Sequence, residues 1–236
     1  MKLLLLSSSR AGDTDYLEHA ETLLKSHLGA QISKVLFIPY AGVTISYQQY
    51  TQLAAKSFES FGYQLESIDD FEDKHKAIKD AEAIAVGGGN TFCLLDSLIR
   101  LDLIETLKQT VSQSTPYIGW SAGSNICGLS IRTTNDMPIV QPDSFEALSC
   151  LPFQINPHYI DGSPPGHHGE TREQRIAEFL IKNPNTKVIG IPEGTALQRL
   201  GNKLTYLGSQ PGYIFSSDSG KQQLSPNADL SNLIQK

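Results

Sequence analysis

A serine in a glycine-flanked turn is the residue of this chain best suited to chemistry. Residues 119–123 read GWSAG and directly follow the apolar run 116–118. This is the G-x-S-x-G pattern of a nucleophile elbow, in which the serine projects from the end of a strand and the next amide can face a developing oxyanion. Ser121 and the amide of Ala122 therefore predict acyl-transfer chemistry, provided that the chain also supplies a base.

His158 is the best candidate for that base, because a serine hydroxyl needs a proton acceptor within hydrogen-bond distance and a third group that orients it. It lies in the segment QINPH at residues 154–158. The other histidines are expected on the surface of predicted helices or in a loop rich in proline and glycine: His19, His27 and His75, and His167 and His168, respectively.

Two carboxylates compete to orient His158. Asp136 lies in the polar turn TTNDMP at residues 133–138, and Glu193 follows a predicted strand in the segment IPEG at residues 191–194. The order Ser121, Asp136, His158 is that of α/β-hydrolases. The order Ser121, His158, Glu193 is that of class I glutamine amidotransferases, which carry cysteine in the elbow. Spacing leaves both possibilities open.

The segment GGGN at residues 87–90 predicts an oxyanion hole. It lacks the lysine and the spacing of a phosphate-binding Walker loop. An amide of Gly88 or Gly89, together with that of Ala122, could stabilise a tetrahedral intermediate, and each such donor contributes on the order of 3 kcal/mol.

A pair of arginines lies near the start of a predicted helix. Residues 171–174 read TREQ, which fits a capping box. Arg172 and Arg175 then share one face near the positive end of the helix dipole, an arrangement that suits a substrate carboxylate. The alternative is an exposed pair that bonds to nearby acids.

The elements around these residues predict an α/β fold with a doubly wound, mostly parallel sheet. Short apolar runs predict buried strands at 3–6, 35–38, 83–86, 117–120 and 188–191, and helical spacing covers 16–28, 47–61, 101–111 and 172–181. From residue 196 onward, alternating segments with turns at Gly201-Asn202 and Pro211-Gly212 predict edge hairpins near the C-terminus.

Ligands in such folds bind beyond the carboxyl ends of the strands. The loops that should form this rim follow Ile38, Val86, Trp120 and Ile191, and each carries an unusual sequence. We therefore expect one site at this edge of the sheet.

Composition narrows the class of protein further. A chain of 236 residues with a net charge of −6 and no basic stripe fits a single catalytic domain, residues 1–236, that binds neither nucleic acid nor membrane. The apolar opening is too short for a signal peptide. Its 3 cysteines show no metal-ligand spacing, which favours reduced thiols and a cytoplasmic location.

These motifs, taken in order, resemble a serine-peptidase family, that of the α-aspartyl dipeptidases of the peptidase E type and the cyanophycinases. The resemblance rests on LLLLS (3–7), FIPYAGVT (37–44), VGGGNTF (86–92), YIGWSAG (117–123), IRTTNDMPIV (131–140), QINPH (154–158) and GETREQRI (169–176). It covers most of the chain, and little is recognised beyond Leu197.

The resemblance implies a class I glutamine amidotransferase-like fold and an exopeptidase that releases N-terminal aspartate from dipeptides and some short peptides, without a metal or cofactor. Ser121 matches the nucleophile and His158 the base. We favour Asp136 as the orienting acid, with Glu193 as the alternative.

The substrate in this interpretation is a small peptide, bound by a monomer or a homodimer. Its aspartyl side chain needs a cation, for which Arg172 is the first choice, ahead of Arg132 and Arg175, and Asn90 is a further candidate for substrate binding. Two rival interpretations are a cyanophycinase-like peptidase for β-linked aspartyl-arginine and a non-catalytic metabolite-binding protein of the same fold.

Overall fold

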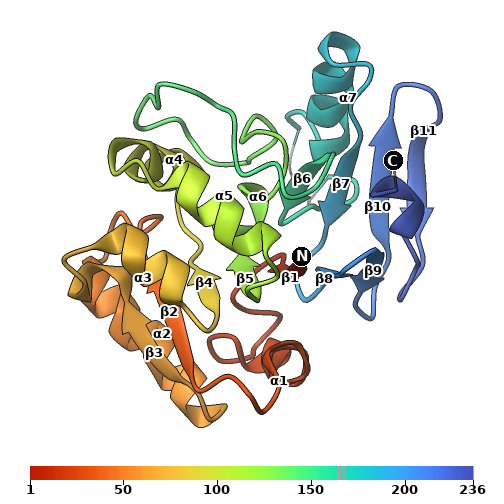
Figure 1. The fold of residues 1–236 in the computed structure, drawn as a ribbon. Coiled ribbons are helices and arrows are strands. Elements are labelled where there is room, and N and C mark those ends of the chain that lie inside the picture. The colour runs from red at the N-terminus through yellow and green to blue at the C-terminus, as the bar shows by residue number, and fades with distance from the viewer. Residues whose placement is uncertain (164–165, 167, 236) are drawn as a thin grey trace.

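The main sheet of the protein has seven strands in the order β3-β2-β4-β5-β1-β8-β9. The structure is a computed structural model and describes residues 1–235 apart from 164–165 and 167. Figure 1 shows the sheet running from β3 at the lower left to β9 at the right. The strands are β1 (Lys2–Leu6), β2 (Lys34–Ile38), β3 (Gln64–Ser67), β4 (Ile84–Val86), β5 (Tyr117–Trp120), β8 (Ala196–Leu200) and β9 (Lys203–Leu207).

Five of these strands are parallel, with β1 and β4 on either side of β5. The register pairs Leu6 with Trp120 and Val86 with Gly119, so the carboxyl ends of three neighbouring strands meet at one rim. Strands β8 and β9 add an antiparallel hairpin at the edge, joined across Gly201 and Asn202. The parallel sheet and this hairpin are confirmed.

A second sheet of four strands, in the order β11-β10-β7-β6, lies beyond this edge (Figure 1). Its strands are β6 (Gln154–Pro157), β7 (Val188–Ile191), β10 (Gly212–Ser216) and β11 (Gly220–Leu224). Strands β6 and β7 are parallel, whereas β10 and β11 form an antiparallel hairpin whose turn lies at residues 217–219. The predicted strand at 188–191 therefore exists, but it belongs to this second sheet. The hairpin turn predicted at Pro211-Gly212 is wrong, because Gly212 begins β10 and the segment before it connects the two sheets.

Helices cover both faces of the main sheet. The described helices are α1 (Glu21–Leu28), α2 (Tyr47–Ser60), α3 (Lys74–Asp80), α4 (Thr91–Arg100), α5 (Ile104–Ser112), α6 (Ala122–Asn125) and α7 (Arg172–Lys182). Leu4 and Leu6 of β1 point into the core under α1 and α2, and Leu3 and Leu5 point into the core shared with α3, α4 and α5. This alternation explains why residues 3–6 of β1 are all apolar, as expected of a strand buried on both faces.

The sequence interpretation did not predict β3, α3, α4, α6 and β6 as helices or strands. Strand β3 is short and has a single apolar residue, and α3 has a charged sequence with only two buried residues. Parts of α4 and β6 lie in recognised motifs, and α6 is only four residues long. The helix expected at 16–28 begins with a 3-10 turn, Glu18–Ala20, and the helix expected at 101–111 begins at Ile104. Among the described residues, no helix is both long enough and apolar enough to cross a bilayer.

His27 is buried, contrary to the expectation that it lies on the surface. Its exposed fraction is 1%, because it occupies the inward face of the last turn of α1 beside Leu24 and Leu28. Burial lowers its pKa from 6.5 to about 4, the charge of Lys2 acts in the same direction, and backbone groups of Tyr117 and Lys2 oppose the shift.

This burial predicts a pH-dependent stability. Between pH 6.5 and about 4 the unfolded chain binds a proton on His27 that the folded chain does not, so the free energy of unfolding falls as the pH is lowered through this range, by on the order of 3 kcal/mol. We expect His27→Leu to flatten this part of the curve, measured by urea unfolding from pH 4 to pH 7.5. An unchanged slope in the variant would contradict the assignment.

Candidate active site

Ser121 lies in a sharp turn between β5 and α6. Its backbone has φ 52° and ψ −111°, a conformation that is strained for a residue with a side chain. A Cβ added to Gly119 would lie 2.3 Å from the carbonyl oxygen of Gly123, and one added to Gly123 would lie 2.1 Å from that of Val86. Both glycines of the elbow pattern are therefore required by close backbone contacts.

His158 reaches Ser121 from the second sheet. It directly follows β6, with φ 53°, and its Nε2 lies 2.9 Å from Ser121 Oγ. Its Nδ1 lies 2.7 Å from Oε1 of Glu193, which follows β7 after Pro192. The parallel pairing of β6 and β7, in register at Pro157 and Ile191, brings the imidazole and the carboxylate to the same end of that sheet.

The Glu193 carboxylate selects the useful tautomer of His158. An ionised carboxylate can only accept hydrogen bonds, so Nδ1 must carry the proton, which leaves Nε2 free to accept the proton of the Ser121 hydroxyl. The His158 and Glu193 side chains are 38% and 58% exposed. The pair is thus open to solvent and to a substrate.

Asp136 does not contact His158; its side chain lies against the amino end of α4. Its Oδ2 accepts hydrogen bonds from the amide and the hydroxyl of Thr91, at 2.7 and 2.5 Å, and from the hydroxyl of Thr134 at 3.0 Å. A carboxylate at this position complements the positive end of the helix dipole. In the structure the group in contact with His158 is Glu193, whereas Asp136, which we had favoured from the sequence, ties the loop after β5 and α6 to the amino end of α4.

The glycine loop lies against the serine. A Cβ on Gly88 would come within 3.0 Å of the Cβ of Ser121, and Gly89 has φ 134°, a value that only glycine adopts readily. A Cβ on Gly89 would also lie 2.1 Å from the carbonyl oxygen of Ala41. Within the described chain, the amides of Gly88, Gly89 and Ala122 donate no hydrogen bond, so they are available to an oxyanion.

Tyr50 holds this loop and was missed by the sequence analysis. Its hydroxyl donates to the carbonyl oxygen of Gly88 at 2.9 Å and accepts a bond from Trp120 Nε1 at 3.2 Å. The carbonyl and amide of a trans peptide point in opposite directions, so this bond turns the amide of Gly89 away from Tyr50. Tyr50 belongs to no motif that the sequence analysis could recognise. Its position on the buried face of α2 is the only signal that could have identified it.

Asn90 has a structural role. Its Oδ1 caps α4 by accepting the amide of Cys93 at 3.1 Å, and its Nδ2 donates to the carbonyl oxygen of Met137 at 2.9 Å. These bonds fix the glycine loop to the segment that holds Asp136. Both Asn90 and Asp136 line a groove of about 350 Å³ that also includes Gly88 and Gly89.

The arginine candidates differ in their freedom to bind substrate. Arg172 begins α7, is half-buried, and has no ion-pair or hydrogen-bond partner among the described residues. Burial and the charge of Arg175 lower the pKa of its guanidinium, whereas the charge of Asp136 opposes the shift and places Arg172 within its electrostatic range. An arginine remains charged nonetheless.

The other two arginines are engaged. Arg132 donates to the hydroxyl of Ser130 at 3.1 Å, approaches Glu146 at 3.9 Å and lies 5.9 Å over the ring of Phe179. Arg175 lies 3.7 Å from Glu170. Arg172 is therefore the freest of the three.

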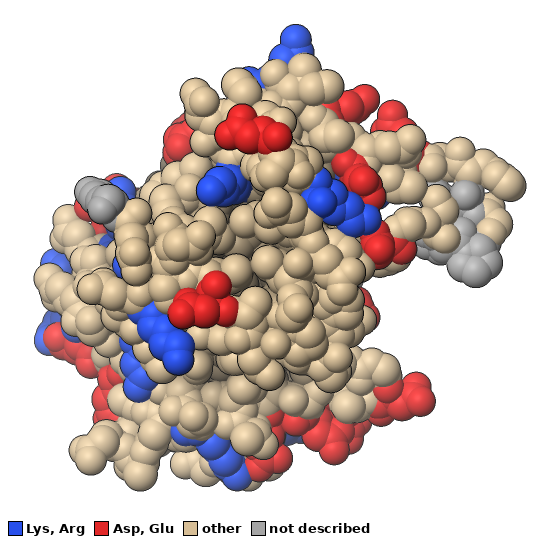
Figure 2. All heavy atoms as spheres, turned by 90° about the vertical axis from the view of Figure 1, so that its right-hand side faces the viewer, with Lys and Arg blue, Asp and Glu red and all other residues tan. Residues whose placement is uncertain are grey.

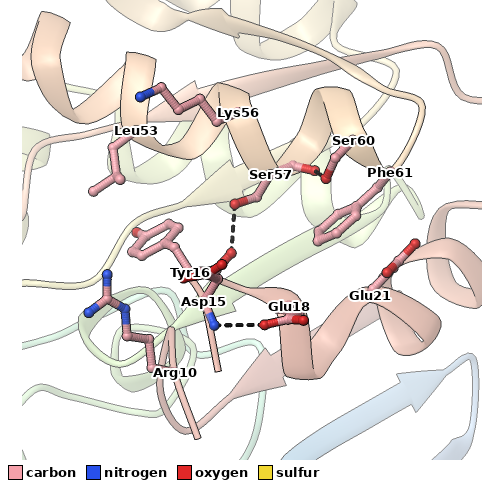
Figure 3. A pocket seen from close by; sticks show the side chains of 10 residues that line it. All are labelled: Arg10, Asp15, Tyr16, Glu18, Glu21, Leu53, Lys56, Ser57, Ser60 and Phe61. Atoms are coloured by element: carbon pink, nitrogen blue, oxygen red, sulfur yellow. Dashed lines mark hydrogen bonds between the residues drawn. The ribbon is translucent and has the colours of Figure 1, made fainter. Parts of the chain in front are cut away.

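A separate cavity of about 480 Å³ lies between the loop after β1 and helix α2. Figure 3 shows Arg10 and Lys56 on one side of it and Glu18 and Glu21 on the other. None of the described residues that line it is a candidate from the sequence. Within the described residues, no cluster of three metal-ligating side chains is present either.

His19 is a titratable neighbour of the site. Burial lowers its pKa, an effect that the negative charge of Glu193 partly offsets. Neither ring nitrogen has a hydrogen-bond partner within the described chain.

Known proteins are similar to this chain in sequence and in fold. The model of Peptidase family S51 matches residues 3–207. A peptidase E from Shewanella baltica (strain OS195) is 51% identical over 98% of this chain and 96% of its own length. A peptidase E from Shewanella amazonensis is 49% identical over 99% of both chains.

A solved structure, that of a peptidase from an acI-B1 actinobacterium, superposes with a TM-score of 0.69 at 21% identity, over 97% of this chain and 96% of its own. At this identity the likeness shows the fold alone. The family match and the full-length relatives go further: the chain belongs to peptidase family S51.

Proposed function

We propose that the protein is a serine exopeptidase that releases N-terminal aspartate from dipeptides and some short peptides. The observation that carries the proposal is the line of contacts from Glu193 through His158 to Ser121, beside the free amides of the glycine loop. The full-length similarity to proteins named peptidase E supports a peptidase of this kind.

The first half of the reaction forms an ester on Ser121. As the Ser121 Oγ attacks the scissile carbonyl carbon, its proton passes to Nε2 of His158, and Glu193 stabilises the imidazolium through Nδ1. The carbonyl oxygen becomes an oxyanion held by the amides of Ala122 and of Gly88 or Gly89. The C–N bond then breaks, and His158 gives its proton to the leaving amine.

The second half releases aspartate. Water takes the place of the departed amine and gives a proton to His158 Nε2 while its oxygen attacks the ester carbonyl carbon. The C–O bond to Ser121 breaks, and the serine oxygen recovers the proton from His158. The same two amides stabilise the second oxyanion.

Recognition of the aspartyl side chain falls to Arg172. A free guanidinium near the positive end of α7 favours a carboxylate both by charge-assisted hydrogen bonds and by the helix dipole. Arg132 and Arg175 rank behind it because they already contact other groups.

We also propose that residues 1–236 act as one catalytic domain in the cytoplasm, as a monomer or homodimer, without a nucleic-acid partner. All 3 cysteines are free, as expected in a reducing compartment. On the face drawn in Figure 2, basic and acidic groups are interspersed and form no continuous basic patch.

Removal of the nucleophile tests the serine mechanism. Ser121→Ala should fold with an unchanged melting temperature, yet hydrolyse Asp-Leu about four to six orders of magnitude more slowly than wild type, because no covalent intermediate can form. The rates are followed by release of aspartate. Wild-type turnover in the variant would rule out this mechanism, and a wild-type enzyme that cleaves β-Asp-Arg but not α-Asp-Leu would instead be cyanophycinase-like.

A pair of isosteric variants tests the choice of acid. Glu193→Gln should lower kcat by about 10²- to 10⁴-fold, because the amide no longer selects the tautomer. It should also remove the low-field proton NMR signal of the His158 Nδ1–H bonded to the carboxylate. Asp136→Asn should keep that signal whatever its activity, since Asp136 contacts Thr91 and Thr134. Loss of the signal in Asp136→Asn alone would reverse the assignment.

Substrate recognition is tested by Arg172→Met. We expect kcat/KM for Asp-Leu to fall by about 10²-fold, because an aspartate side chain would lose a charged partner. Arg132→Met is the matched control and should stay within about threefold of wild type on the same substrate. Equal losses in the two variants, or none in Arg172→Met, would show that Arg172 does not recognise the aspartyl side chain.

A further inference from the structure

Ser7 occupies the point where the two sheets meet at the active site. It is the first residue after β1, an interior strand that pairs with β5 on one side and β8 on the other, and its exposed fraction is 0%. The candidate nucleophile follows β5 in the main sheet, whereas the base and acid follow β6 and β7 in the second sheet. Some contact between the sheets must set their separation.

The Ser7 side chain makes such a contact directly. Its Oγ accepts a hydrogen bond from the amide of His158 at 2.9 Å and donates one to the carbonyl oxygen of Ile191 at 2.7 Å. The Ser7 amide donates to the carbonyl oxygen of Thr195 at 2.9 Å. Ser7 therefore hydrogen-bonds to the backbone of His158 and to the backbone on both sides of the short loop that carries Glu193.

The preceding residue, Leu6, holds the nucleophile. Its carbonyl oxygen accepts the amide of Ser121 at 3.2 Å and the hydroxyl of Ser124 at 2.6 Å. Two consecutive residues at the end of β1 thus fix the backbones on both sides of the Ser121–His158 contact. His158 has φ 53°, so the bond from its amide to Ser7 also helps to hold a strained conformation.

We infer that Ser7 is a positioning residue of the active site, which aligns His158 and Glu193 with Ser121 through its hydroxyl. It touches neither the substrate nor the reacting atoms. This inference rests on the proposed role of Ser121, His158 and Glu193.

The test compares Ser7→Ala and Ser7→Cys with Ser130→Ala. Cysteine retains the volume of the side chain but is a weak donor and acceptor, so it separates hydrogen bonding from packing. Ser130 is an equally buried serine, and its hydroxyl binds the side chain of Gln154 at the opposite end of β6 from His158. Its loss should lower the melting temperature without moving the base.

We expect Ser7→Ala and Ser7→Cys to lower kcat for Asp-Leu by about 10- to 100-fold with KM within threefold of wild type, since a shift of about 1 Å in a reacting group can cost about 10²-fold. The low-field NMR signal of the His158–Glu193 hydrogen bond should shift or broaden in both. Ser130→Ala should retain the signal and kcat.

An unaltered signal and kcat in folded Ser7→Cys would overturn the inference, as would equal losses in Ser130→Ala. The NMR measurement needs no substrate. If the wild-type protein failed to hydrolyse Asp-Leu, the proposed function would fall, and the signal would still report whether Ser7 sets the His158–Glu193 geometry.

Discussion

The contact between Ser121 Oγ and His158 Nε2, at 2.9 Å, joins side chains carried by two different sheets. Within the described chain, no strand of one sheet forms a ladder with a strand of the other. Their relative position depends on packing and on individual hydrogen bonds instead. Ile155 of β6 and Ile189 of β7 share a core with Ala122 and Ile126 around the elbow helix, and Asn125 donates to the carbonyl oxygen of Ile155 at 2.8 Å.

This construction concentrates backbone strain where the chemistry takes place. Ser121 and His158 both have positive φ values although neither is glycine, and each such residue costs on the order of 1 to 3 kcal/mol. The strain persists because the amide of Ser121 donates to the carbonyl oxygen of Leu6 and the amide of His158 donates to the hydroxyl of Ser7. In return, each side chain projects past the end of its strand toward the other.

Much of the main sheet could be predicted from the sequence, because short apolar runs bounded by glycine or proline are a strong signal of buried parallel strands. The expectation that a site lies beyond the carboxyl ends of the strands also pointed to the loops that carry Ser121, the glycines at 87–89 and Glu193, although the strand before Glu193 belongs to the second sheet. Applied to β1 as well, it would have singled out Ser7. The burial of His27 was missed because a histidine in a helix carries no sign of the face it occupies.

The choice between Asp136 and Glu193 could not be made from the sequence. Asp136 lies in a polar turn and Glu193 follows a strand, and which of them meets His158 depends on strand pairing. Strand β6 is paired with β7 in a separate sheet, which places Glu193 beside the imidazole. The spacing of residues along the chain does not show that β6 and β7 form a sheet of their own. For the same reason, the strand predicted at 188–191 lies in the second sheet and not in the main one.

The most direct test is a crystal structure of the Ser121→Ala variant with Asp-Leu bound. We expect the scissile carbonyl carbon at about 3 to 3.5 Å from the site of the missing hydroxyl, with the carbonyl oxygen facing the amides of Ala122 and the glycine loop and the aspartyl carboxylate on Arg172. A peptide bound away from His158, or a His158 that contacts Asp136 in the complex, would contradict this expectation.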